Sequence, residues 1–419
     1  MNEGGSRSGF GLRQSKARSM LIVGEVGLAL VLLVGAALLI RTFIALHQVQ
    51  PGFDAHNVIT MEMALNGPRY EKTAGVAQLM HESRERIRAI PGVEEVAVSN
   101  TLPLDGGFGL PFIVVGRPLK DGPYHGGGEW KATSPGYFAA LHIPIVRGRD
   151  FTVNDVAGAP PVVLISEAFA KKNWKKDEDP VGQQIVIGKG VGPEFEEPAR
   201  TIIGIVGDVH DGALDEPVNE VMIIPLAQMA DGVMALNSRI GPLIWVVRTR
   251  TEPHQVIPAV TEQLRNASGG FPTAHIRTMD EIMVRSTARQ NFNMLLLSIF
   301  GFSALALAAI GIYGLMAYSV TQRVREIGIR MALGAQRLAV MRLVLADVLW
   351  LAGIAIVVTL PVAIVLSRIV RSQLYNVSPA DPVVLVLGTL LVALVALLSA
   401  FLPARRAATV EPMKALRTE

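Results

Sequence analysis

The sequence predicts an α-helical membrane protein with four transmembrane helices and an α/β domain inserted between helices 1 and 2. Of the 419 residues, 50% are hydrophobic and only 18% are charged, an average too apolar for an ordinary soluble protein. The apolar residues gather in four runs, each long enough to cross the roughly 30 Å hydrocarbon core of a bilayer. Residues 43–290, between the first two runs, contain no comparable run.

The predicted spans are residues 20–42, 291–320, 343–367 and 383–402. The first contains Glu25 and the third contains Asp347 near its start, whereas the second and fourth carry no charged residue. A cleavable signal peptide is the alternative for the first run. That run is longer than the roughly 7–15 apolar residues of signal peptides and lacks an obvious small-residue cleavage site, so we expect it to span the membrane.

Basic residues near the span ends predict the orientation of the chain. They gather before the first span, between the second and third, and after the fourth: Arg7, Arg13, Lys16, Arg18, Arg323, Arg325, Arg330, Arg337, Arg342, Arg405, Arg406, Lys414 and Arg417. The loop 368–382 has only Arg368 and Arg371. Because cytoplasmic loops concentrate lysine and arginine, we expect residues 1–19, 321–342 and 403–419 in the cytoplasm. Residues 43–290 and 368–382 are then extracytoplasmic.

The inserted domain begins and ends with similar patterns. Alternating and helical periodicities predict a strand, a helix and a strand in residues 57–100, and the same order in residues 243–279. Each unit has the element order of half a split βαβ sandwich. We therefore expect one subdomain to form from about residues 43–115 together with 243–285.

A second subdomain is expected from about residues 130–240. Apolar, β-branched runs within it predict further strands at "VVLIS", "QQIVI", "TIIGIV" and "EVMIIPL", the first of them leading into a short helix. Glycine and proline are frequent in residues 102–128 and 188–198, so both stretches are expected to be loops.

The chain lacks the residues that several chemistries need. It has no cysteine, which excludes disulfides, thiolate zinc sites and cysteine nucleophiles. It contains no G-x-x-x-x-G-K-[ST] phosphate loop, and Ser166 lacks the flanking glycines of a nucleophile elbow. A net charge of only +3 does not support nucleic-acid binding by bulk charge. We therefore predict a protein that is not an enzyme and needs no cofactor or metal.

Two carboxylates inside the apolar runs are candidates for polar contacts between spans. Glu25 and Asp347 both lie near the predicted cytoplasmic ends of their spans. They either extend to the headgroup region or make a functional contact in the membrane. Span two also carries a series of small residues, which permit close helix packing within this chain or across a dimer: Gly301, Ala304, Ala308, Gly311 and Gly314.

The cytoplasmic segment 321–342 combines charge with apolar residues. Residues 325–335 contain no proline and can form a short helix, on which isoleucine, methionine and leucine alternate with polar or small residues. Not all of these apolar side chains can face lipid. The residues alone leave two interpretations open: a basic edge of the membrane, or a docking surface for a cytosolic partner.

Two motifs in this part of the chain resemble one known family. "REIGIRMALGA" after the second span and "PARRAATVEPMKALR" at the C-terminus are similar to segments of the MacB/FtsX-like ABC permeases. The order of one span, a large extracytoplasmic domain and three spans is also similar. "QPGFD", "VGDVHDGAL" and "VGEVGLALVLLVGAALLIRTF" resemble most closely the acidobacterial duplicated orphan permeases within that group.

The resemblance implies a permease subunit in a bacterial cytoplasmic membrane. Such subunits dimerise and are driven by a separate cytosolic ABC ATPase, whose hydrolysis of ATP changes the extracytoplasmic domain and supports export. The resemblance assigns the ATPase-coupling role to Arg325, Glu326, Gly328, Arg330, Leu333 and Gly334. The alternative is a transmembrane regulator that activates an extracytoplasmic partner without transport.

The resemblance also bears on the length of the chain. The orphan permeases carry two such halves, and this sequence contains one. We expect either a half-size subunit that forms a homodimer, or the second half of a longer protein that pairs with the first half as a pseudo-dimer. Membrane lipids are the remaining expected partners.

Overall fold

The computed structural model describes residues 8–119, 122–195, 197–333 and 336–409. The chain divides into two compact units. One comprises the residues up to Gln48 and those from Arg289 onward, and is called here the helical unit. The other is Val49–Ala288, called here the inserted unit.

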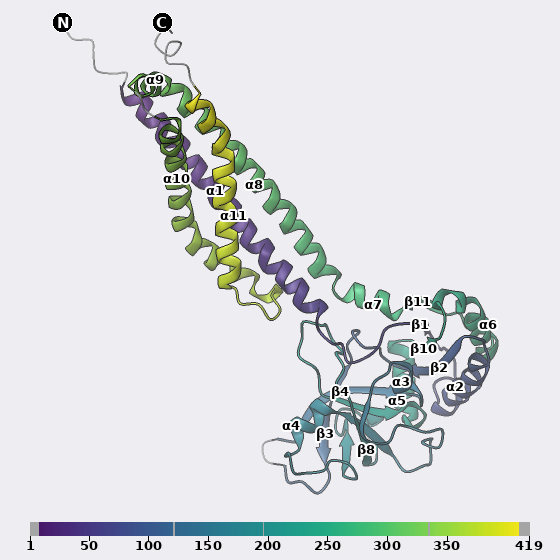
Figure 1. The fold of residues 1–419 in the computed structure, drawn as a ribbon. Coiled ribbons are helices and arrows are strands. Elements are labelled where there is room, and N and C mark those ends of the chain that lie inside the picture. Colours follow the sequence, from purple (N-terminus) through teal and green to yellow (C-terminus); the bar gives the residue numbers. More distant parts are fainter. Residues whose placement is uncertain (1–7, 120–121, 196, 334–335, 410–419) are drawn as a thin grey trace. The chain divides into compact units, whose positions relative to one another are not determined.

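The helical unit consists of long helices and one short one (Figure 1). Its elements are α1 (Ser8–His47), α8 (Ala288–Gln322), α9 (Val324–Ala332), α10 (Arg337–Ser367), a 3₁₀ turn η4 (Ile369–Gln373) and α11 (Pro382–Ala408). Within the described residues, four of these helices are long and apolar enough to cross a membrane. The predicted fold class of four spans with an α/β insertion after the first is therefore confirmed.

Small residues allow the long helices to pack closely. A Cβ placed on Gly27 of α1 would lie 2.6 Å from the hydroxyl oxygen of Thr359 in α10. On α11, Ala396 and Ala400 are fully buried in the apolar core of the unit. In a bilayer, apolar side chains gain little by leaving lipid, so close van der Waals packing of this kind holds helices together.

The inserted unit contains a first group of strands that comes from both of its ends. This terminal strand group is β1 (Val58–Met63), β2 (Val93–Ser99), β10 (Leu243–Thr249) and β11 (Ala274–Thr278), with helices α2 (Thr73–Arg88), α6 (Ile257–Ser268) and α7 (Met279–Ser286) and the 3₁₀ turn η3 (Pro253–Gln255). The strands are antiparallel in the order β11-β1-β10-β2. The late unit thus inserts β10 between the two strands of the early unit, as in a split βαβ sandwich.

The burial of β10 shows how this sheet is held. All seven of its residues are buried. Trp245 and Val247 belong to the apolar cluster that includes α2 and α6, whereas Ile244 and Val246 belong to the cluster that includes the short helix α3 (Tyr137–Ala140). Because strand side chains alternate between faces, β10 contributes to two apolar layers, which explains the apolar run from Leu243 to Val247.

A second group of strands forms a closed ring. This central strand group is β3 (Phe108–Val114), β4 (Gly126–Thr133), β5 (Ile145–Gly148), β6 (Val162–Ser166), β7 (Gln184–Ile187), β8 (Arg200–Val206) and β9 (Val221–Pro225), with helices α3, α4 (Glu167–Asn173) and α5 (Asp231–Ile240) and 3₁₀ turns η1 (Pro193–Phe195) and η2 (Leu226–Gln228). The order is β4-β3-β7-β8-β6-β9, and β9 pairs back with β4. β5 pairs with β8 outside the ring, and Ser99 with Thr133 joins β2 to β4.

The expected loop at residues 102–128 is wrong in part, because it contains β3 and the start of β4. Pro111 lies inside β3, and Gly126, Gly127 and Gly128 begin β4. A Cβ on Gly128 would lie 3.0 Å from the carbonyl oxygen of Glu220, so glycine here permits close contact rather than a turn. β3 pairs with β4 and β7, so it belongs to the central strand group. Its residues nevertheless fall within the range 43–115 that was expected for the first subdomain.

Candidate functional site

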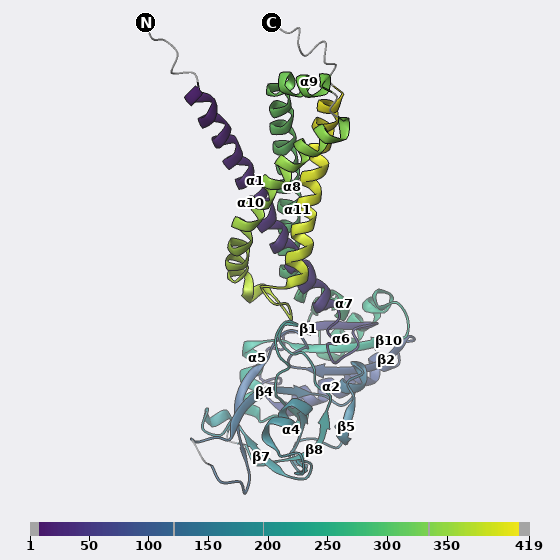
Figure 2. The ribbon, with the colours of Figure 1, turned by 60° about the vertical axis from the view of Figure 1, so that its left-hand side comes forward.

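α9 is a separate helix between two long ones. α8 ends at Gln322, and Arg323 has a φ of −99° and a ψ of 9°, which breaks the helix before α9 begins at Val324. α9 lies at the end of the helical unit where α8 stops and α10 begins (Figure 2). The short helix expected within residues 325–335 is therefore present as α9, which begins one residue earlier and ends at Ala332, while residues 334–335 lie outside the described residues.

One apolar side chain anchors α9 and others remain outside. Ile327 is 5% exposed and belongs to the apolar core of the helical unit. Ile329 is 45% exposed and Leu333, which directly follows the helix, is 83% exposed. Gly328 is buried beside Ile327. α9 therefore has a fixed inner side and an outer side on which large apolar groups are accessible.

Charged groups on α9 are paired at its surface. Nη2 of Arg330 donates a hydrogen bond of 2.7 Å to Oε1 of Glu326, one helical turn earlier. Both side chains are about half exposed, at 49% and 55%, so the pair contributes about 0.3–0.5 kcal/mol at most to stability. Its main effect is to hold a carboxylate and a guanidinium together on the outer surface.

Asp347 connects α10 to the start of α9. Its Oδ2 accepts a hydrogen bond of 3.0 Å from Nη1 of Arg323, the residue that separates α8 from α9. Sequence reasoning selected Asp347 but not Arg323, since the two are far apart along the chain. The contact joins the third span to the end of the second.

Glu25 lies against the small residues of α8. A Cβ on Gly311 would lie 2.1 Å from Oε2 of Glu25, so the carboxylate occupies the space that the missing side chain leaves. This oxygen is buried and has no hydrogen-bond partner among the described residues. A groove of ≈ 350 Å³ opens beside it, lined also by Leu21, Leu315 and Tyr318.

The structure brings together only part of the predicted site. Arg325, Glu326, Gly328 and Arg330 lie in α9 and Leu333 caps its end, while Gly334 lies outside the described residues. Glu25 and Asp347 are on different helices and share no contact that the described residues record. The missed residues are Arg323 and Ile327. The position of Arg323 just after an uncharged span is the one sequence signal that could have indicated an ion pair.

These features define a class of protein: a multi-pass membrane protein with a large α/β domain after its first span and a short exposed helix after its second. Residues 23–267 match the family model of the MacB-like periplasmic core domain. Residues 298–412 match that of the FtsX-like permease C-terminal region. The chain therefore belongs to the MacB/FtsX-like family of ABC transporter permeases.

Curated relatives of the chain are exporters. The pyoverdine export ATP-binding/permease protein PvdT of Pseudomonas syringae pv. syringae is 26% identical over 377 residues, which are 87% of this chain and 51% of that protein. The macrolide export ATP-binding/permease protein MacB of Rhodospirillum rubrum is 25% identical over 295 residues, 68% of this chain and 42% of that protein. The chain thus spans about half the length, or less, of these relatives.

One solved structure with a similar region is the periplasmic region of MacB from Actinobacillus actinomycetemcomitans. It has 15% sequence identity and a TM-score of 0.35, and the match covers 57% of this chain and 95% of that chain. The family assignment rests on the two family models, both of which describe permease regions.

Proposed function

We propose that this chain is the permease subunit of an ABC transporter of the MacB/FtsX type, driven by an ATPase on a separate cytosolic chain. ATP hydrolysis on that chain would change the conformation of the inserted unit and support export. The observation that carries the proposal is α9, a short helix anchored by Ile327 with apolar and charged groups on its outer side.

The contacts of α9 suit it to transmit a force. An amphipathic helix that docks in a partner's groove is a common mode of recognition, and Ile329 and Leu333 supply exposed apolar groups for it. Ile327 on the opposite side is packed in the core of the helical unit. The Arg323–Asp347 ion pair links the same point to α10. A displacement of α9 would therefore move the ends of two predicted spans.

The orientation follows from this role. We propose a cytoplasmic location for residues 1–19, 321–342 and 403–419, and an extracytoplasmic one for residues 43–290 and 368–382. The spans would be residues 20–42, 291–320, 343–367 and 383–402, in a bacterial inner membrane. The extracytoplasmic part would consist of the two subdomains expected from the sequence, one drawn from both ends of residues 43–290.

A second permease half is the other expected partner. α8 exposes large apolar side chains along much of its length, among them Phe302, Leu307 and Ile310, which are 67%, 63% and 68% exposed. In a membrane these face lipid or a second helical unit. We propose that the chain pairs with a second permease half, as a homodimer or a pseudo-dimer. We also propose that it belongs to the acidobacterial duplicated orphan permeases.

A second candidate function is regulation of an extracytoplasmic partner without transport. The buried side chains described on the four long helices are almost all apolar, with Thr42, Thr359 and Ser367 as polar ones. Among the described residues of these helices, Glu25 has a buried carboxylate oxygen and lies near one end of its predicted span; the scarcity of buried polar groups supports a role without transport. A transport assay with purified subunits in vesicles distinguishes export from regulation.

The ATPase proposal is tested by copurification of the tagged protein with the P-loop ATPases of its own cell, with and without ATP. The variant is Arg325→Ala/Glu326→Ala/Leu333→Ser, and the control is Leu119→Ser, a 44% exposed leucine in the inserted unit. We expect an ATPase with the native protein and the control, and a loss of about tenfold or more with the variant, because hot-spot residues dominate interfaces.

Yield and membrane insertion of each variant are measured alongside. Equal recovery of the ATPase with both variants would leave α9 as a basic edge of the membrane. If the triple variant failed to insert into the membrane, these residues would instead have a role in fixing the membrane topology of the chain.

A further inference from the structure

The inserted unit has two chain connections to the helical unit. The first is the end of α1, which stops at His47, next to the boundary between the units at Gln48. The second is the start of α8 at Ala288. A motion of the long helices reaches the inserted unit along the chain only through these two helix ends. The contacts that hold the two ends therefore matter for any motion that is passed between the units.

Within the helical unit, α1 and α8 pack directly over part of their length. A Cβ on Gly35 of α1 would lie 2.7 Å from Cδ2 of Leu297, and a Cβ on Gly301 of α8 would lie 3.5 Å from the carbonyl oxygen of Leu32. Closer to the chain connections, polar contacts hold each helix to residues 369–381, called here the α10–α11 loop. Figure 1 shows this loop at the end of the helical unit opposite α9.

Two polar contacts join the end of α1 to the α10–α11 loop. Nη1 of Arg41 donates to Oδ2 of Asp381, the last residue of the loop. One residue further along α1, the hydroxyl oxygen of Thr42 accepts from the backbone NH of Tyr375 at 3.4 Å. Thr42 is 1% exposed and the side chain of Asp381 is 14% exposed, so the protein largely covers both contacts.

The two carboxylate oxygens of Asp381 have different partners. Oδ1 accepts from the backbone NH groups of Val383 and Val384 at 2.9 and 3.2 Å, which caps the N-terminus of α11. Oδ2 is the atom that binds Arg41. A carboxylate is stabilised at a helix N-terminus by the unpaired NH groups and by the helix dipole. The cap therefore holds in place the carboxylate to which α1 is joined.

The start of α8 contacts the same loop. Nδ2 of Asn293 donates to Oε1 of Gln373 at 3.3 Å, in the 3₁₀ turn η4 that opens the loop. The loop is also fixed to its surroundings. Leu374 packs against the apolar core of the helical unit, and the hydroxyl of Ser367 in α10 donates to the carbonyl oxygen of Pro379 at 2.8 Å. One loop thus contacts both helices that lead to the inserted unit.

We propose that the α10–α11 loop is a clip that ties the end of α1 to the start of α8, so that the two chain connections to the inserted unit move together. Arg41 and Asp381 are its main positioning residues, because their ion pair joins α1 to a capped helix end. Thr42, Asn293 and Gln373 add neutral hydrogen bonds to the same assembly.

The clip also has a transmitting role, which rests on the proposed function. Asp347 of α10 contacts Arg323 next to α9, and α10 leads directly into the loop. A displacement that an ATPase causes at α9 would therefore reach both chain connections through α10. The clip itself needs no ATPase, so the clip and its transmitting role are tested separately.

The clip is tested by distances between spin labels on the full chain in lipid nanodiscs. Ile44→Cys on α1 and Phe292→Cys on α8, at positions 50% and 60% exposed, form the connection pair. Leu28→Cys and Leu307→Cys, at positions 58% and 63% exposed on the same two helices, form the control pair. The chain has no cysteine of its own. Labelled chain is diluted with unlabelled chain before reconstitution, so that distances within one chain dominate the signal.

Two variants break the ion pair and a third is their matched control. Asp381→Asn keeps an acceptor that can cap α11 but removes the charge that Arg41 binds, and Arg41→Gln removes the other partner. We expect each to widen the distance distribution of the connection pair about twofold, because a helix end that loses its contacts opens locally. Arg368→Gln removes an exposed arginine with no side-chain hydrogen bond or ion pair recorded in the described structure, and should change nothing. The control pair should keep its width in all three.

Three results would overturn the clip. The first is an unchanged connection pair in both Arg41→Gln and Asp381→Asn. The second is equal widening by Arg368→Gln, which would be an effect of net charge. The third is equal widening of both label pairs, which would be a general loss of stability.

The transmitting role is tested by adding the copurified ATPase, with and without ATP. ATP should shift the distance of the connection pair in the native protein but not in Asp381→Asn, although hydrolysis continues. A shift that persists in Asp381→Asn would overturn transmission through the clip. If no ATPase bound the native protein, the proposed function and the transmitting role would both fail, while the first experiment would still decide the clip.

Discussion

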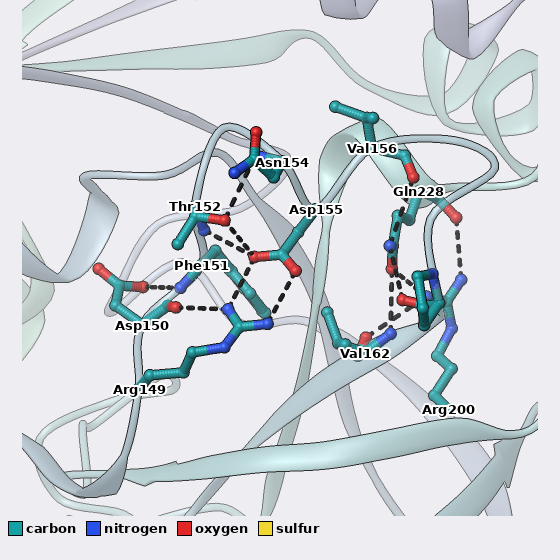
Figure 3. Close-up of polar contacts among 11 residues, drawn as sticks. Arg149, Asp150, Phe151, Thr152, Asn154, Asp155, Val156, Val162, Arg200 and Gln228 are labelled. Carbon is teal, nitrogen blue, oxygen red and sulfur yellow. Dashed lines mark hydrogen bonds and ion pairs between the residues drawn. The ribbon is translucent and has the colours of Figure 1, made fainter.

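The buried carboxylate of Asp155 is held by hydrogen bonds in the loop after β5 (Figure 3), and these bonds change its pKa. Burial raises the pKa of this carboxyl, but hydrogen bonds from Arg149 and Thr152 outweigh burial and leave the pKa below its ordinary value of 3.8. The carboxylate side chain is 8% exposed. The charged form is thus stabilised by the folded loop, and protonation removes that stabilisation.

The expected consequence is a defined pH dependence. A lowered pKa contributes stability that is complete above 3.8 and is lost as the pH falls below 3.8 through the folded-state pKa. Asp155→Asn should lower the free energy of unfolding by about 1–2 kcal/mol at pH 7, and the difference from the native protein should shrink below pH 3.8. Thermal unfolding followed by circular dichroism across this range measures it.

A matched control is Asp177→Asn, which replaces an exposed carboxylate with no hydrogen bond or ion pair recorded in the described structure. It should change neither the stability nor its pH dependence. The same difference for both variants would show that the effect comes from net charge rather than from the loop.

The sequence indicates which single residues of the candidate site are unusual, but it does not indicate which residues they contact. Carboxylates in apolar runs are rare, so Glu25 and Asp347 could be selected from the sequence. The Arg323–Asp347 pair required the fold, since it joins two helices. Likewise, the alternating apolar residues of α9 are evident in the sequence, but only the packing separates buried Ile327 from exposed Leu333.

At the scale of elements, the predictable ones have strong periodicity. The apolar spans, α2, α6 and strands such as β6 and β9 follow from residues that are apolar at regular positions. β5 was not predictable, because it has only four residues and most are exposed. β3 and β4 contain proline and glycine, which their packing accommodates. Because these residue types usually indicate a loop, the two strands were not predicted.

Gly148, at the end of β5, allows this strand to lie close to β8. Its φ is +80°, and a Cβ there would lie 2.1 Å from the carbonyl oxygen of Ile203. Gly158 has a φ of +87° but no atom within 4 Å of such a Cβ. Gly158→Ala should therefore cost only the strain of positive φ, about 1 kcal/mol. Gly148→Ala should cost about 3 kcal/mol or more, because β5 must also move away from β8.

Thermal unfolding of both variants gives the comparison, and limited proteolysis near residues 145–150 reports release of β5. Equal losses for the two variants would mean that backbone strain alone accounts for the effect. A stable Gly148→Ala protein would contradict the pairing of β5 with β8.

At the scale of the whole molecule, the absence of cysteine makes the proposed orientation easy to test. Lys176→Cys lies at an exposed position of the inserted unit and Gln336→Cys at an exposed position between α9 and α10. In intact cells, a membrane-impermeant maleimide should label the first and not the second, since loops rich in arginine remain in the cytoplasm. Permeabilised cells should show both labelled. The reverse pattern in intact cells would invert the topology.

The overall architecture was predictable because it depends on long patterns. Four apolar runs fix the number of spans, and the repeated strand–helix–strand order indicates a subdomain drawn from both ends of the insertion. The closed ring of the central strand group was not predictable, because the β4–β9 pairing joins residues around 130 and 222 and no local pattern specifies such a partner.

The split of the terminal strand group has a consequence for the order of folding. Val58 pairs with Arg248 and Ile59 with Thr278, so β1 leaves the ribosome long before either neighbour exists. The central strands pair among themselves within residues 108–225. Since pairings between distant residues form slowly, we expect the central strand group to fold first. The apolar strands β1 and β2 would remain exposed until β10 and β11 have been synthesised. Protection of such nascent segments, by a chaperone or by the membrane machinery, would then govern how much of the chain reaches its native state.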